Sequence, residues 1–284
     1  MSFEIILHAI RRKIRHAFFL CADGSGRQAS KRFVAYMQEK ASRLGMGNSH
    51  FVNASGATMR SRSTAADLLR LALCASRRAE IEDVWSIRSA EISVSGPHRR
   101  NLSIVSQIDG AALRAMLPYH ILGAKSGSWG ETHKALVIRC SGTRGPITSC
   151  LMVDDAQCFK DIYSIAKELF DHVCGGEIGH DLQRFIDSGG SFAAEYDGIR
   201  IMRNEDDRHV PASTTKLLTV LCALDLLSPD DQITIHGMDI ASGSGSAFYP
   251  GDIISVCDAI KGALVESSNT LAHALCRTAG ERCM

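Results

Sequence analysis

Two residues at the start of an apolar segment have the types and the spacing of a nucleophile and its base. Residues 211–216 read PASTTK and lead into a helical pattern that ends near Leu227. Helical residues three apart lie on one face, so the hydroxyl of Ser213 and the amine of Lys216 can approach within hydrogen-bonding distance. Lysine can deprotonate a serine only where burial or a nearby cation keeps its amine neutral. The spacing alone is weak, because an ordinary capped helix contains it as readily.

Two further groups could act on the same substrate. Ser267-Ser268-Asn269 follows the apolar run 262–265, and by itself could be a local helix cap. Lys125-Ser126-Gly127 lies on a predicted strand, where a cation and a hydroxyl stand side by side and Gly127 leaves one face open. An edge strand of this kind can pair with an extended substrate and hold a carboxylate.

The elements that must position these groups alternate between helical and strand patterns. Apolar spacing predicts a helix over 30–44, capped by Ser30, and a second that starts at Ser63-Thr64 and ends before Arg77. Further helices are predicted over 156–173, 179–187, 214–227 and 255–277, the last with a break near Ser267. Three antiparallel strand pairs are predicted, at 91–95 with 101–108, 134–140 with 148–154, and 192–196 with 199–203. This order of elements indicates a mixed α+β class.

The composition is that of an ordinary globular protein. The chain has 284 residues, of which 45% are hydrophobic and 22% charged, and this length suits one large or two small domains. Its 32 Lys and Arg against 31 Asp and Glu give a net charge of +1. Nucleic-acid-binding domains are usually markedly basic, so no nucleic-acid partner is predicted.

Cysteine usage and hydropathy limit the classes further. The ten cysteines include no C-x-x-C pair, so a structural zinc site is not predicted, and most of the thiols are expected in the core. We therefore expect no metal and no cofactor. The longest apolar stretch, Leu217 to Leu227, contains Asp225 and is shorter than the roughly 20 residues of a membrane helix. No membrane span is predicted.

The N-terminal residues 1–29 form a leader whose role the sequence leaves open. A basic cluster at 11–16 precedes the apolar run Ala17 to Cys21. A secretory signal has about 7–15 apolar residues in that place, so a signal peptide is not predicted. A solvated basic leader and a surface amphipathic helix both fit the pattern.

Together with their flanks, the three motifs resemble a known family. The set S-x-x-K, S-x-N and K-T/S-G is typical of serine β-lactamases and penicillin-binding proteins. Four stretches of this chain are similar to the low-molecular-weight D-alanyl-D-alanine carboxypeptidases of the serine peptidase S11 family: 211–219, 248–269, 47–56 and 123–127. The resemblance implies a β-lactamase/transpeptidase-like fold, with an antiparallel sheet flanked by helices and an all-helical part.

The order of the motifs departs from the family. In the family S-x-x-K comes first, then S-x-N, then K-T-G, whereas here Lys125 precedes Ser213. The chain resembles a circular permutant: residues 30–284 would form a single transpeptidase-like domain. In it, 30–173 would be the later, K-S-G half, and 174–284 the earlier half with S-x-x-K and S-x-N. Permutation is physically possible where termini lie close together. The alternatives are two halves that belong to separate copies and an order produced by the way the gene was delimited.

The resemblance implies an activity and roles for three residues. The chain would be a serine-type D-Ala-D-Ala carboxypeptidase that removes the terminal D-alanine of peptidoglycan pentapeptides and is acylated by penicillins. Ser213 would be the acylating nucleophile and Lys216 the base that takes its proton. Ser267 would relay a proton toward the leaving D-alanine.

The resemblance also implies substrate-binding residues. Asn269 would hydrogen-bond the substrate amide, while Lys125 and Ser126 would hold the terminal carboxylate. Gly127 would keep the strand open, and the backbone amides of Ser213 and Ser128 would form the oxyanion hole. The implied partners are a stem peptide ending in D-Ala-D-Ala and β-lactams as covalent inhibitors.

Two other functions stay open at this point. One is a serine β-lactamase, and the other is a non-catalytic or fragmentary penicillin-binding-like domain. The resemblance implies action in the cell envelope, whereas no convincing signal peptide is visible, so the location is left open. The preference between hydrolysis and transpeptidation is also left open.

Overall fold

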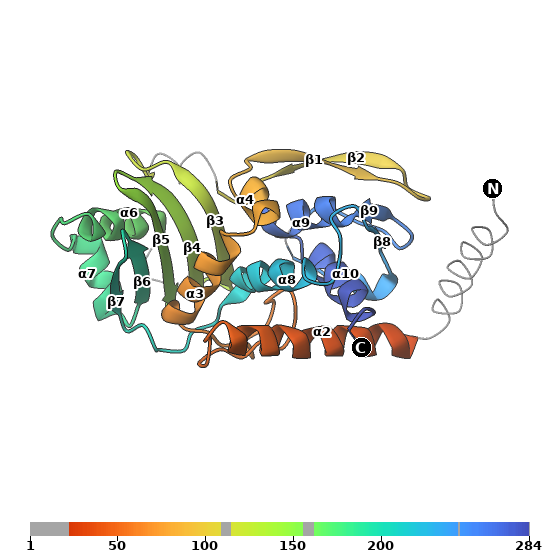
Figure 1. Cartoon of the computed structure of the whole chain (residues 1–284), viewed down its shortest axis with the longest axis horizontal. Helices are drawn as coiled ribbons and strands as arrows, with labels where there is room; N and C mark the ends of the chain where they lie inside the picture. The colour runs from red at the N-terminus through yellow and green to blue at the C-terminus, as the bar shows by residue number, and fades with distance from the viewer. Residues whose placement is uncertain (1–22, 109–114, 156–161, 244, 284) are drawn as a thin grey trace.

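The computed structural model describes residues 23–108, 115–155, 162–243 and 245–283. It is an α+β structure in which an antiparallel sheet with its covering helices lies beside a mainly helical part (Figure 1). This confirms the predicted fold class. Most of the predicted leader, the start of the helix predicted at 156–173 and Cys158 lie outside the described residues.

The sheet has five strands in the order β3-β4-β5-β6-β7, and every neighbouring pair is antiparallel. Its strands are β3 (Ile121–Trp129), β4 (His133–Gly142), β5 (Gly145–Val153), β6 (Ser191–Tyr196) and β7 (Ile199–Arg203). The predicted pairs at 134–140 with 148–154 and at 192–196 with 199–203 are therefore confirmed. Because β3 lies at one end of this order, its outer edge is not paired with any of the strands that the structure describes.

Alternating side chains of the sheet bury both of its faces. Leu136 and Leu151 pack in one hydrophobic cluster with α6 (Ile162–Val173) and α7 (His180–Asp187). Their neighbours Val137 and Met152 pack in a second cluster with α3 (Ala65–Ala75) and α8 (Thr215–Ala223). This period of two is the signature of a strand with covered faces, and it fixes which face of β3 lies toward α8.

The mainly helical part packs around α8. Its helices are α2 (Asp23–Arg43), α4 (Ala79–Trp85), α9 (Val256–Leu264) and α10 (Asn269–Gly280), of which α2, α9 and α10 contact α8. It also contains two small antiparallel pairs, β1 (Ser89–Val94) with β2 (Arg100–Val105) and β8 (Gln232–Thr234) with β9 (Ile253–Ser255), and the 3-10 turns η1 (Ala212–Thr214) and η2 (Gly237–Asp239). Helix α10 packs against α2, where Arg32 donates to the carbonyl of Gly280 at 3.1 and 3.2 Å. The helices that begin and end the described chain are therefore neighbours (Figure 1).

Several predicted boundaries are confirmed and some are wrong. Thr64 caps α3 by accepting from the amide of Asp67, and the break near Ser267 separates α9 from α10. Ser30 is no cap: it lies inside α2, and its hydroxyl donates to the carbonyl of Gly26 at 3.0 Å. The helix predicted to reach Leu227 ends four residues earlier, at Ala223.

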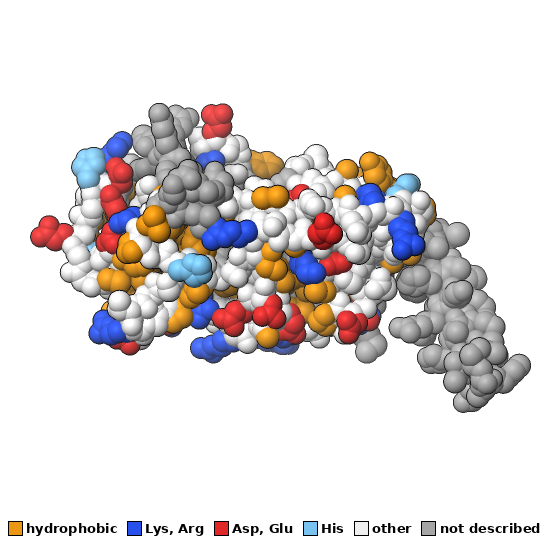
Figure 2. Space-filling view, turned by 90° about the horizontal axis from the view of Figure 1, so that it is seen from above, with side chains coloured by type: hydrophobic (Ala, Val, Ile, Leu, Met, Phe, Trp, Pro, Cys, Tyr) orange, Lys and Arg blue, Asp and Glu red, His pale blue; other side chains and the backbone are white. Residues whose placement is uncertain are grey.

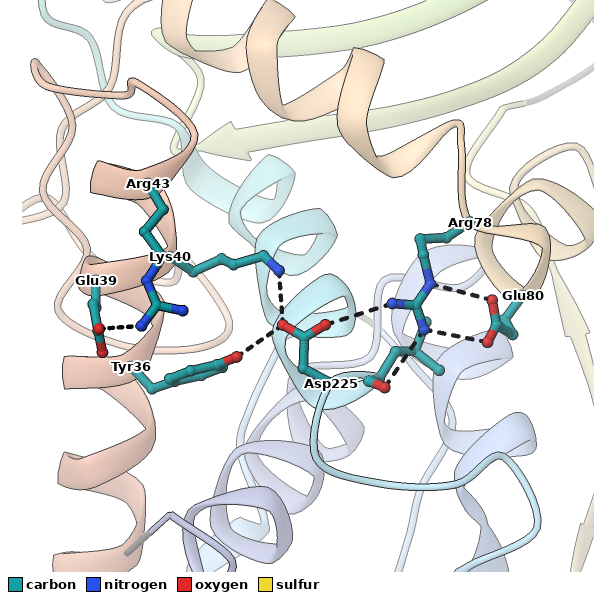
Figure 3. Close-up of polar contacts among 8 residues, drawn as sticks. Tyr36, Glu39, Lys40, Arg43, Arg78, Glu80 and Asp225 are labelled. Atoms are coloured by element: carbon teal, nitrogen blue, oxygen red, sulfur yellow. Dashed lines mark hydrogen bonds and ion pairs between the residues drawn. The ribbon is translucent and has the colours of Figure 1, made fainter.

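An ion-pair network holds α2 against the end of α8. Asp225 accepts from Tyr36 and Lys40 of α2, both at 2.8 Å, and from Arg78 at 3.5 Å (Figure 3). Arg78 also contacts the carboxylate of Glu80 and the carbonyl of Leu224. One carboxylate therefore connects α2, the segment between α3 and α4, and the chain after α8.

The described surface mixes both signs of charge. Figure 2 shows acidic and basic side chains interspersed over one face, with hydrophobic side chains scattered among them. The eight described cysteines are free thiols, and Cys140, Cys150, Cys222 and Cys276 are buried. In the described ranges, no helix has the length and apolar character needed to cross a membrane.

Candidate active site

Ser213 lies in a tight turn held at the start of α8. The turn η1 begins after Pro211, whose carbonyl accepts from the hydroxyl of Thr214 at 2.6 Å. Ala212 has a φ of 45°, a left-handed conformation that L-residues with a side chain adopt only at a cost. Ser213 itself is half-buried, between Ala212 and Thr214, which are fully buried. The fold thus supports a strained turn next to this hydroxyl.

Lys216 is the nearest base to that hydroxyl. Its Nζ lies 2.8 Å from Ser213 Oγ and 2.9 Å from the carbonyl oxygen of Ser55, and the side chain is completely buried. Burial lowers the pKa of Lys216 well below its ordinary value, and the charge of Lys125 lowers it further. A neutral amine at 2.8 Å can accept the proton of Ser213.

Ser267 and Lys125 form the second contact of the site. Ser267 connects α9 to α10 with a φ of 65°, and its Oγ accepts from Lys125 Nζ at 2.9 Å. The same Nζ donates to the carbonyl of Ser126 at 2.9 Å. Lys125 is 2% exposed, and burial lowers its pKa to about 7. The pair joins β3 to the α9–α10 junction.

Asn269 is the first residue of α10, and only one of the two polar atoms of its side-chain amide is hydrogen-bonded. Its Nδ2 donates to the carbonyl of Ser242 at 2.9 Å. Its Oδ1 is buried and has no hydrogen-bond partner among the described residues. Buried polar atoms are usually paired, so this oxygen is a candidate acceptor for a ligand amide. Ser268 caps α10 by accepting from the amide of Leu271.

Gly127 lets β3 lie directly against the turn that contains Ser213. A Cβ at this position would come 2.8 Å from the amide nitrogen of Ser213 and 2.9 Å from the carbonyl oxygen of Pro211. Any larger residue would therefore separate the strand from the turn. Ser126 is half-buried and Ser128 is exposed, at the end of the strand that opens to solvent.

These residues share one cleft. A cavity of about 670 Å³ is lined by Ser126, Gly127, Ser128, Ser213, Ser267 and Asn269, among others. Lys125 and Lys216 do not line it but contact its serines from the buried side. All eight residues singled out from the sequence therefore lie in or directly behind a single cleft.

The role of Ser55 was missed from the sequence. Its carbonyl accepts from Lys216, its hydroxyl lies 3.1 Å from Nε2 of His273, and the next residue, Gly56, contacts Ala212. Burial lowers the pKa of His273, and the charge of Lys216 lowers it further. The family resemblance had drawn attention to Gly56, but a backbone carbonyl such as that of Ser55 leaves no signal in residue types.

Asp154 anchors the chain that leads into the turn. Its carboxylate accepts from the amide of Val210 at 3.1 Å and lies 3.6 Å from the ring of His209. The other ring nitrogen of His209 lies 2.7 Å from the hydroxyl of Ser191. Since Ser191 is completely buried and does not line the cleft, this arrangement positions backbone rather than presenting a second nucleophile.

The comparisons with known proteins agree with part of this picture. Residues 22–156 match the family model of peptidase S11, described as D-alanyl-D-alanine carboxypeptidase. The matched segment contains Gly56 and the strand of Lys125, while Ser213 and Ser267 lie outside it. No curated protein matches the chain. Across the described part of the chain, no group of three or more His, Cys, Asp or Glu could hold a metal ion.

Proposed function

We propose that this chain, of which residues 22–156 match the peptidase S11 family of D-alanyl-D-alanine carboxypeptidases, is a member of that family and a serine-type hydrolase acting through an acyl-enzyme on Ser213. Its substrate would be a peptidoglycan stem peptide that ends in D-Ala-D-Ala. The observation that carries the proposal is the contact of a buried lysine with a cleft serine, Lys216 Nζ to Ser213 Oγ at 2.8 Å. Such peptides are crosslinked outside the membrane, so we propose the cell envelope as the place of action.

In the acylation step, Ser213 Oγ attacks the carbonyl carbon of the penultimate D-alanine. Lys216 takes the hydroxyl proton, and the peptide bond to the terminal D-alanine breaks as the ester bond forms. The leaving amine receives a proton through Ser267, whose Oγ is held by Lys125. The amides of Ser213 and Ser128 would stabilise the oxyanion, and Asn269 Oδ1 would accept from a substrate amide. Water then hydrolyses the ester and restores the serine.

The contacts between the two parts of the chain favour a permuted single domain over two separate copies. Lys125 lies in the K-S-G half and contacts Ser267 of the other half at 2.9 Å. Likewise, Ser55 of the first half accepts from Lys216 of the second at 2.9 Å. A site whose pairs are made across both halves within one chain needs no second copy.

The test is release of D-alanine from a diacetyl-L-Lys-D-Ala-D-Ala peptide by the purified chain. Ser213→Ala and Lys216→Ala should each lower kcat/KM by at least about 10³-fold, because removing a nucleophile or its base removes the chemical step. Ser42→Ala, at an exposed position of α2, is the matched control and should leave the rate unchanged. Release of D-alanine that persists in Ser213→Ala would contradict the assignment.

The same preparations separate the alternatives. Rapid turnover of a chromogenic cephalosporin would identify a β-lactamase instead of a carboxypeptidase. A folded chain that neither releases D-alanine nor becomes acylated by penicillin would be a non-catalytic binding domain.

A further inference from the structure

We propose that His273 is a positioning residue for the base Lys216, and that it acts through Ser55. The inference rests on the proposed function and adds to it a residue that orients the base from behind the cleft. His273 lies in α10, one helical turn after Asn269. None of the three motifs includes it, and no step of the proposed reaction uses it.

A series of contacts leads from His273 to the nucleophile. The ring nitrogen Nε2 lies 3.1 Å from Ser55 Oγ. The carbonyl of Ser55 accepts from Lys216 Nζ at 2.9 Å, and the same Nζ lies 2.8 Å from Ser213 Oγ. Ser55 and Lys216 are completely buried. Because His273 does not line the cleft, its effect is on the base and not on the substrate.

The partners of the ring determine which of its nitrogens carries the proton. His273 also hydrogen-bonds the backbone carbonyl of Asp239, and a carbonyl can only accept. Since Nε2 faces Ser55, Nδ1 donates to this carbonyl. Burial lowers the pKa of His273 and the charge of Lys216 lowers it further, while the opposing carboxylate of Asp239 is paired with Arg277 at 3.0 Å. The ring is therefore neutral at pH 7, and its Nε2 accepts the hydroxyl proton of Ser55.

The hydroxyl of Ser55 is held from two sides. It donates to His273, and it accepts from the amide of Ala57 at 3.3 Å. The buried hydroxyl thus joins α10 to the segment 55–57, whose middle residue, Gly56, packs on the turn before Ser213. These contacts fix the position of the Ser55 carbonyl.

That carbonyl controls the direction of the lone pair of Lys216. A neutral amine has one lone pair, which must point at the hydroxyl whose proton it takes. Donation of one N–H of Lys216 to the Ser55 carbonyl restricts rotation of the amine, and the lone pair is left to face Ser213 Oγ. Loss of the His273 contact would release Ser55 and with it this orientation.

The experiment is a double-mutant cycle on acylation. Wild type, His273→Leu, Ser55→Ala and the double variant are compared by the second-order rate constant for labelling with a fluorescent penicillin. Ser55→Ala keeps the backbone carbonyl that Lys216 uses. Each single change should lower the rate constant about 10–100-fold, the usual effect of a misplaced catalytic group. The double variant should be no slower than the single variants, because both changes break the same contact.

Two further variants serve as controls. His273→Gln places an amide oxygen where Nε2 accepts, so its rate constant should stay within about threefold of the wild type. His180→Leu removes an exposed ring of α7 and should label at the wild-type rate.

The unmodified chain gives an independent measurement. Long-range ¹H–¹⁵N NMR of the histidine-labelled chain should show a neutral His273 ring with its proton on Nδ1, in a signal that His273→Gln lacks. A proton on Nε2 would overturn the inference, because Ser55 could not then donate to the ring. Losses that multiply in the double variant would also overturn it, since they would show two independent structural effects. A wild-type chain that is not acylated would instead overturn the proposed function, and this inference with it.

Discussion

Replacing Gly56 by alanine should destabilise the chain and disturb the turn that contains Ser213. Gly56 has a φ of +74°, and a Cβ there would come 1.8 Å from the carbonyl oxygen of Ala212. The left-handed conformation costs a residue with a side chain roughly 1–2 kcal/mol. Relief of a backbone overlap adds about 1–3 kcal/mol. We therefore expect a loss of about 2–5 kcal/mol in the free energy of unfolding.

Urea denaturation measures the loss of stability, and the rate of labelling by a fluorescent penicillin measures whether the turn that holds Ser213 keeps its conformation. The labelling rate of folded Gly56→Ala should fall at least about tenfold, because the new Cβ displaces the carbonyl of Ala212, the residue before Ser213. Gly47→Ala is the matched control: nothing lies within 4 Å of its Cβ position, and its φ is not left-handed. If Gly56→Ala stayed within about 0.5 kcal/mol of the wild type and labelled normally, the packing of segment 56 on Ala212 would be refuted.

Two further predictions concern buried and bridging charges. Asp225→Ala removes the acceptor of Tyr36 and of two cations, and it should lower the free energy of unfolding measured in urea by about 1–2 kcal/mol. Glu39→Ala removes an exposed ion pair of α2, the helix of Tyr36 and Lys40, and should cost less than about 0.5 kcal/mol. Equal losses in the two variants would contradict the role of Asp225. The folded-state pKa of Lys125 is about 7 against 10.5 for a free lysine, so between these values the unfolded chain binds more protons and stability rises with pH. Lys125→Met should therefore show a smaller rise in urea midpoint from pH 7 to pH 10 than the wild type, and equal rises would show that Lys125 titrates normally.

The residues of the site could be singled out from the sequence because they occur in short motifs with local geometry. The spacing of Ser213 and Lys216 on one helical turn places their side chains together wherever the helix forms. Alternation and turn residues also predicted the hairpins at 134–140 with 148–154 and at 192–196 with 199–203, whereas the strand of Lys125 was predicted without its partner β4. The α+β class followed from the order of these elements.

The remaining features depend on contacts between distant parts of the chain. No local pattern could show that the carbonyl of Ser55 accepts from Lys216, or that Lys125 is held by Ser267 and buried. The pairing of β3 with β4 became visible only in the structure. Ser30 was misread because its hydroxyl bonds back within a helix that begins earlier, a geometry that competes with capping.

The short elements were missed for a different reason. Helix α4 has seven residues, and β8 and β9 have three each. Segments of this length contain less than two periods of a helix or a strand, so hydrophobic spacing cannot separate them from loops. Tertiary packing fixes them instead: Ile81 and Trp85 of α4 are buried in the main hydrophobic cluster.

The most direct test of the central claim is intact-protein mass spectrometry with and without benzylpenicillin, followed by peptide mapping. We predict a single adduct of the mass of one penicillin, located on Ser213 and absent from Ser213→Ala. An adduct on another residue, or no adduct on a chain shown to be folded, would contradict the account.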